Sequence, residues 1–301
     1  MATSTGVQID QTAECGVSVM CGAAVAADAV PTFEIAPPSG WLELNLREVW
    51  AYRELLYFLV WRDLKVRYKQ TVIGVGWVII QPLFTMLVFT FFFGRLAKMP
   101  SGGLPYPVFY YCALLPWMYF ASALTNATNT VVEQEKVITK VYFPRVLLPI
   151  SSVLSGLVDF SVSFVLAIGL MMVYHITPKP TALLVPVFLL LAIATALGTG
   201  LWLSALNALY RDVRYTIPFL VQVWMFASPV AYPSTLIPVR WRWLYGLNPM
   251  AGVIEGFRWS LTGVGQPPSA FLLVSAAAVV VLLVGGLIYF KNMEGTIADR
   301  I

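Results

Sequence analysis

Residues 271–290 read FLLVSAAAVVVLLVGGLIYF, and no charged residue interrupts them. About 20 such residues in a helix cross the roughly 30 Å hydrocarbon core of a bilayer. The rest of the chain has the same character, since 59% of its 301 residues are hydrophobic and only 11% are charged. A soluble domain is about 45 to 50% apolar and about 25% charged, and it could not bury this much apolar surface. The sequence therefore predicts an all-α integral membrane protein.

Six apolar segments are candidates for membrane spans. They are residues 72–93, 108–128, 146–174, 183–210, 217–232 and 271–290. Between the fifth and the sixth, residues 234–263 are apolar but are interrupted by Pro238, Gly246 and Pro249, which predicts re-entrant helices rather than a span. Residues 1–40 are rich in Ala, Ser, Thr and Pro, which is typical of a disordered tail.

An amphipathic helix is predicted over residues 45–69, ahead of the first span. At 100° per residue, basic side chains such as Arg47 and Lys65 share one face, and apolar ones such as Leu56 share the opposite face. This pattern indicates a helix that lies in the membrane interface. Asp63 and Arg67 are four residues apart on it, and we expect them to pair.

Basic residues set the orientation, because Lys and Arg are retained on the cytoplasmic side. With the amino terminus inside, most of the 19 Lys and Arg residues fall in cytoplasmic segments. Both termini are therefore predicted to be cytoplasmic. The net charge of +4 is explained by these loops and does not indicate nucleic-acid binding.

Motifs for catalysis are missing from the sequence. It contains no G-x-x-x-x-G-K-[ST], no H-E-x-x-H and no paired cysteines, and His175 is its only histidine. We therefore expect no catalytic residue, no metal and no bound cofactor in this chain.

Asp159 lies deep inside the third predicted span. A charge at that depth costs about 2.5 to 3.5 kcal/mol on insertion scales, so its carboxylate must face protein or water. A proton relay is one interpretation, but no second ionisable residue lies inside a span. We expect instead a structural pair with a basic residue near the cytoplasmic face, such as Arg145 or Arg214.

Aromatic residues make up 14% of the chain. Many are typical of interfacial belts, but some could line a conduit for sugars, because aromatic rings stack on the C–H faces of pyranoses. The candidates for a conduit or gate are Trp77, Phe84, Tyr110, Trp117, Trp224, Phe226, Trp241, Trp243 and Tyr245.

Several stretches together resemble one family. Residues 62–74 read RDLKVRYKQTVIG and lead into Gly76-Trp77 and Gln81-Pro82. They are followed by ITKVYFPR at 138–145, YRDVRY at 210–215, SPV at 228–230 and LNPM at 247–250. In this order, over residues 41–301, they resemble the ABC type-2 permeases that export bacterial surface polysaccharides such as O-antigen, capsule or teichoic acid.

The resemblance implies a machine of several subunits in the bacterial inner membrane. Such a permease works as a homodimer with two separate ATPase subunits, which use ATP and Mg²⁺, and it moves a lipid-linked glycan. A cytoplasmic coupling helix at residues 129–142 would contact the ATPase. The residues implied there are Glu133, Glu135, Lys136, Lys140, Tyr142 and Arg145. The lipid diphosphate would meet the interfacial residues Arg47, Arg53, Arg62, Lys65 and Arg67.

Two other functions compete with glycan export. One is an ABC type-2 efflux permease for small hydrophobic drugs or lipids, which the aromatic density and the quoted stretches disfavour. The other is a membrane-embedded glycosyltransferase or ligase. It would need acidic or histidine catalysts in outer loops. After the first span, Glu255 is the only carboxylate that is predicted to lie on the outer side.

Overall fold

The computed structural model describes the backbone of residues 46–69, 76–140, 143–264 and 270–300, and the side chains of these except 46–48, 239, 270 and 297–300. Within this part of the chain the protein forms helices and no strand. Five helical segments are long and apolar enough to cross a membrane: Gly76–Leu96, Tyr106–Glu133, Leu147–Val173, Pro180–Leu209 and Phe271–Thr296. They match five of the six predicted spans, and the expected all-α membrane architecture is confirmed at this level.

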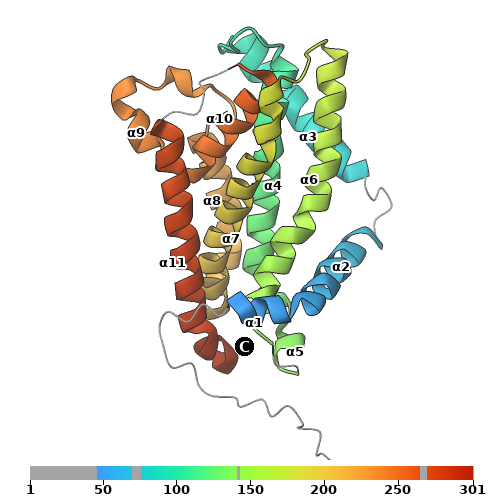
Figure 1. Ribbon diagram of the computed structural model, residues 1–301, viewed down its shortest axis with the longest axis vertical. Coiled ribbons are helices and arrows are strands. Elements are labelled where there is room, and N and C mark those ends of the chain that lie inside the picture. Colours follow the sequence, from blue (N-terminus) through green and yellow to red (C-terminus); the bar gives the residue numbers. More distant parts are fainter. Residues whose placement is uncertain (1–45, 70–75, 141–142, 265–269, 301) are drawn as a thin grey trace, which may run out of the picture. The chain divides into compact units, whose positions relative to one another are not determined.

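The long helices lie side by side (Figure 1). They are α3 (Gly76–Phe89), which continues into the π-helical turns η1 (Thr90–Leu96), α4 (Tyr106–Glu133), α6 (Leu147–Val173), α7 (Val185–Leu209), preceded by the 3₁₀ turn η2 (Pro180–Leu184), and α11 (Ala270–Arg300).

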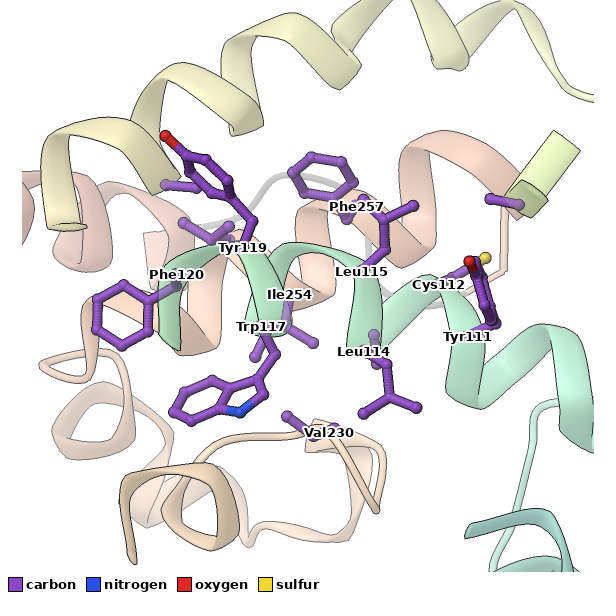
Figure 2. Close-up of a cluster of buried hydrophobic side chains, with 14 of the residues drawn as sticks. Tyr111, Cys112, Leu114, Leu115, Trp117, Tyr119, Phe120, Val230, Ile254 and Phe257 are labelled. Atoms are coloured by element: carbon purple, nitrogen blue, oxygen red, sulfur yellow. The ribbon is translucent and has the colours of Figure 1, made fainter. Parts of the chain in front are cut away.

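Helix α4 is the centre of the packing. It contacts α3, α6, α7, α8 and α10, and large side chains along it, such as Tyr110 and Phe120, are fully buried. Figure 2 shows Tyr119 and Trp117 directed to opposite sides of α4. Because neighbouring helices cover most of α4, its aromatic rings form the core and stabilise the bundle.

Helices α7 and α11 approach each other backbone to backbone. A Cβ on Gly286 would lie 2.4 Å from the carbonyl oxygen of Gly198, and one on Gly198 would lie 2.7 Å from the backbone nitrogen of Leu283. Only glycine permits this approach, which is how small residues bring membrane helices together.

The fifth predicted span corresponds to α8 (Asp212–Ala227), which differs from the prediction at both ends. Its 16 residues reach only about 24 Å at 1.5 Å per residue. The helix ends before Ser228, whose backbone is extended (φ −107°, ψ 154°). Pro229 follows, and the residue before a proline is disfavoured in helical geometry.

The segment after α8 folds as short turns and one buried helix. The elements are η3 (Ser234–Leu236), η4 (Val239–Trp241), α9 (Arg242–Tyr245) and α10 (Pro249–Thr262). Asn248 begins α10 by accepting a hydrogen bond from the backbone N–H of Met250, and Gly263 ends it with φ +68°. Helix α10 packs against α4, α7 and α11, at the end of the bundle opposite α5 (Figure 1).

The predicted interfacial helix is two helices, α1 (Leu46–Ala51) and α2 (Arg53–Lys69), and α2 runs beside α6. The predicted coupling helix at 129–142 is also divided. Its first residues continue α4 to Glu133, and a separate short helix, α5 (Glu135–Ile138), follows.

Candidate functional site

Helix α5 turns its apolar side inward and its charges outward. Glu135, Lys136 and Lys140 are exposed, whereas Val137 and Ile138 are half-buried. Ile138 packs against two separate buried clusters. One joins α4, α7 and α11 around Leu201, and the other joins α2 and α6 around Leu59. A force applied to α5 would therefore reach both α2 and the α7–α11 pair.

The other predicted coupling residues contact neighbouring helices of the same chain. Glu133, the last residue of α4, lies 3.6 Å from Arg214 at the start of α8, and both side chains are exposed. The backbone N–H of Arg145 donates to the Glu294 carboxylate on α11 at 2.9 Å, and its guanidinium donates to the Glu294 carbonyl oxygen. Tyr142 lies outside the described residues.

The basic residues predicted for the lipid diphosphate do not all face solvent. Arg53 and Lys65 are exposed. Arg62 is paired with the adjacent Asp63 at 2.9 Å, and Arg67 is half-buried against α6. The side chain of Arg47, in α1, lies outside the described part.

The apolar face predicted for this helix packs on protein. Tyr52, Leu56 and Leu59 contact a cluster formed with Phe143 and Leu147. Tyr57, Phe58 and Trp61 remain exposed on a different face.

The predicted pair between Asp63 and Arg67 is wrong, and the expected pairing of Asp159 with a basic residue is confirmed with a different partner. Asp63 does not pair with Arg67, and Asp159 does not pair with Arg145 or Arg214. Instead Arg67 Nη1 donates to Asp159 Oδ2 at 2.5 Å, and the Tyr68 hydroxyl donates to Asp159 Oδ1. An i, i+4 pair on a helix contributes only about 0.2 to 0.5 kcal/mol, less than the cost of leaving a carboxylate unpaired at membrane depth.

Tyr68 is a member of this site that the sequence did not reveal. Burial, together with the hydrogen bond to the Asp159 carboxylate, raises its pKa to about 12. The phenol is therefore neutral at physiological pH and acts as a hydrogen-bond donor. Tyr68 follows Arg67 directly, so α2 brings two adjacent donors to one carboxylate.

A pocket of about 430 Å³ lies beside this carboxylate, between α3, α4 and α6. Asp159 is on its wall together with polar side chains of α3 and α4, such as Gln81 and Ser122. Aromatic rings, among them Tyr119 and Phe160, form other parts of the wall. The Asp159 ion pair therefore connects α2 to this pocket.

The aromatic residues predicted for a conduit or gate fall into two groups. Exposed rings lie on α3, on α8 and in the turns before α10: Trp77, Phe84, Phe226, Trp241 and Trp243. The others are engaged inside the protomer. Tyr110 and Trp117 are buried in α4, Trp224 donates to Asn248 Oδ1 at 2.9 Å, and the hydroxyl of Tyr245 lies 3.2 Å from that of Tyr232.

Asn248 connects two of the stretches quoted above, SPV at 228–230 and LNPM at 247–250. Its side chain caps α10, accepts from Trp224, and donates to the Ser228 hydroxyl at 2.9 Å. The stretch around Asn248 is thereby joined to the stretch around Ser228 at the end of α8. An Asn before a proline is a helix-start signal, and it was available in the sequence.

A buried ion pair lies within α10. Arg258 Nη1 donates to Glu255 Oε1 at 3.1 Å, and the two side chains are only 2% and 10% exposed. Arg258 also donates to the Pro229 carbonyl at 2.8 Å, and its guanidinium carbon lies 4.0 Å from the centre of the Phe109 ring. The i, i+3 spacing from Glu255 was the signal for the pair.

Comparison with known proteins gives a consistent result. The profile of the family described as ABC-2 type transporter matches residues 54–262. The O-antigen export system permease protein RfbA of Myxococcus xanthus is 32% identical over 258 residues, which are 85% of this chain and 98% of that protein. RfbA of Klebsiella pneumoniae is 26% identical over 82% of this chain and 94% of its own length. The polysialic acid transport protein KpsM of Escherichia coli is 23% identical over 64% of this chain and 76% of its own length. The chain thus belongs to the ABC-2 type transporter family, as a transmembrane permease subunit of the kind that lacks the ATPase domain.

Proposed function

We propose that this chain is the permease of an ATP-driven exporter that moves a lipid-linked O-antigen, or a related surface polysaccharide, across the bacterial inner membrane. The observation that carries the proposal is the 32% identity to an O-antigen export permease over 98% of that protein's length. Membership of the family implies an ATPase partner. We further infer two permease copies and two ATPase copies in the complex.

The α5 end of the bundle is the cytoplasmic end in this proposal. Most of the predicted cytoplasmic Lys and Arg residues belong to α2, α5 and the loops at that end, in keeping with the retention of positive charge inside. Both termini then lie in the cytoplasm. The α9 and α10 segment lies on the outer side, where Trp241, Trp243 and Tyr245 form a gate.

Helix α8 completes the six spans. Its 16 residues are too few to cross alone, but the turns after Ala227 extend its path, and α10 re-enters from the outer side. The burial of α10 supports this, because a re-entrant segment and the non-helical turns that lead into it are tolerated at membrane depth where protein covers them. The exposed rings of α3 and α8, including Trp77, Phe84 and Phe226, would face a conduit between two protomers.

Helix α5 receives the force of ATP hydrolysis. The exposed Glu135 and Lys136 of α5, and Lys140 just after it, would contact the ATPase, while Ile138 transmits movement to both buried clusters. Arg145 would position the end of this segment through Glu294, whereas the solvent-screened pair of Glu133 with Arg214 would contribute little. The lipid diphosphate would approach the exposed Arg53 and Lys65 of α2, since anionic headgroups bind basic interfacial helices.

The coupling charges provide the test. We expect Glu135→Ala, Lys136→Ala and Lys140→Ala combined to abolish surface polymer in a strain that lacks the native gene, while the protein still inserts in the membrane. The readout is surface polymer by immunoblot, with membrane-fraction protein as the measure of insertion.

Arg95→Ala is the matched control, since Arg95 is also exposed but lies at the far end of the α3 segment. It should leave export intact. Normal export from the triple variant would refute the coupling role. A strain without the gene that still displays all its surface polymers would refute the exporter itself.

A further inference from the structure

The pocket between α3, α4 and α6 has a polar lining at membrane depth. Asp159 lies twelve residues into α6, about 18 Å along the helix from Leu147. The polar side chains on the wall are Gln81, Thr85, Ser122, Asp159 and Ser163. Lipid chains cannot satisfy such groups, and polar residues inside membrane segments mark functional sites by default. The occupant of the pocket must therefore be polar.

The volume of the pocket suits a ligand rather than a few waters. Its about 430 Å³ falls within the roughly 300 to 1,000 Å³ of ordinary ligand sites. It has room for a pyranose ring with its hydroxyls.

The hydrogen-bonding state of Asp159 selects among polar ligands. Arg67 and Tyr68 each donate to one of its oxygens, which fixes the position of the carboxylate. A carboxylate has about four acceptor positions, and these two donors use two of them. The remaining acceptors favour a ligand with several hydrogen-bond donors. An ionised diphosphate has no such donors and therefore fits this site poorly.

The aromatic wall adds a second requirement. The Tyr119 hydroxyl donates to the Val153 carbonyl at 3.2 Å, and the Tyr111 hydroxyl donates to the Ser163 carbonyl at 3.1 Å. Because these hydroxyls already have partners in the protein, the rings offer apolar surface rather than hydrogen bonds. A ligand with both hydroxyl groups and an apolar C–H face meets both requirements.

We propose that this pocket binds one neutral sugar residue of the glycan during transport, with Asp159 accepting hydrogen bonds from its hydroxyls. The proposal rests on the glycan-export function above and deepens it. Arg67 and Tyr68 are positioning residues, because they act on the sugar only through Asp159. Since both belong to α2, a movement of α2 would change the position of Asp159 and so the affinity for the sugar.

Site-specific photocrosslinking in cells that export the glycan tests this proposal. A diazirine-bearing amino acid is introduced by amber suppression at Ser122, which lines the pocket, or at Ser161, which is exposed on α6 and does not line it. The full transporter with its ATPase is irradiated, and the permease is blotted with antibody to the glycan. We expect a glycan ladder from the Ser122 site and its loss when glycan synthesis is blocked.

Each outcome bears on one proposal. Equal ladders from Ser122 and Ser161, or a ladder from Ser161 alone, would overturn the pocket. So would an absence of any ladder from a Ser122 variant that still exports glycan. If the Ser122 variant does not export, the probe is placed at Thr85, which also lines the pocket, and the same results support or overturn the proposal. Failure of the unmodified chain to export any glycan would instead refute the proposed function.

Discussion

Two ion pairs hold charges inside this helical bundle, and they differ in how they could respond to movement. Arg258 and Glu255 belong to one helix, are almost fully buried, and have further partners in Pro229 and Ser234. Arg67 and Asp159 belong to different helices, 92 residues apart in sequence, and their side chains are 28% and 23% exposed. A shift of α10 moves both members of the first pair together and leaves them in contact. The second can separate if α2 shifts along α6. We infer that the first is structural and the second is mechanical.

Breaking the buried pair should have the largest effect on stability. Arg258→Met leaves the Glu255 carboxylate without its cation, and removing one member of a buried pair costs about 3 to 5 kcal/mol. We expect the variant to be depleted from membranes and to unfold at lower temperature in detergent.

The double variant Arg258→Met and Glu255→Leu is the control for that effect. Replacing both members with apolar residues is often neutral, so it should recover much of the lost stability. A double variant as unstable as the single one would mean that the pair is required for a reason other than the orphaned charge.

Breaking the interhelical pair should affect export more than stability. Asp159→Asn removes charge-assisted hydrogen bonds that contribute about 1.5 to 3 kcal/mol when buried, and partial exposure reduces this to about 1 to 2 kcal/mol. Membrane levels should stay near normal while surface polymer falls sharply. Arg67→Lys keeps the charge but loses the planar guanidinium, so it should lose less export. Stability losses equal to those of Arg258→Met would contradict the comparison.

The sequence revealed the spans but not the partners of the charges inside them. Five of the six spans predicted from apolar length match helices long and apolar enough to cross a membrane, because the requirement of the bilayer is local in sequence. The cation for Asp159 lies on a helix 92 residues away, and its choice depends on how α2 docks on α6. Only the need for some cation could be read from the sequence.

Predictions from spacing along one helix also failed where a contact between helices is energetically stronger. The spacing of Asp63 and Arg67 favoured a pair, but the unpaired Asp159 carboxylate competes for Arg67 with a larger energy. Asp63 accepts instead from Arg62 and from the Ser151 hydroxyl on α6, at 3.3 Å. In contrast, the end of α8 at Ser228 was predictable, since Pro229 imposes it locally.

Tyr68→Phe tests the second hydrogen bond to Asp159, and we expect a smaller effect than from Asp159→Asn. The pKa of Tyr68 is raised from 10 to about 12, so the neutral phenol is favoured in the folded protein. Its contribution to stability is complete below pH 10 and is lost as pH rises from 10 to about 12. Below pH 10, the Phe variant should be less stable by about 0.5 to 1.5 kcal/mol, a typical hydrogen bond. The difference in melting temperature from the native chain should shrink through this window. A difference that does not change with pH would show that the hydroxyl is not bonded to Asp159.

The exposed pair between Glu133 and Arg214 should matter least. Its atoms are 3.6 Å apart, and both side chains are more than half exposed, so solvent screens the attraction to about 0 to 1 kcal/mol. We expect Arg214→Ala to leave the melting temperature and the amount of surface polymer almost unchanged, and high salt to remove any remaining difference. Because Glu133 ends α4 directly before α5, a large loss of export would show that Arg214 fixes the start of the coupling segment or contacts the ATPase itself. Comparing ATPase activity of the purified complex with export in cells would separate these two roles, since lost contact lowers both and a displaced α5 lowers export alone.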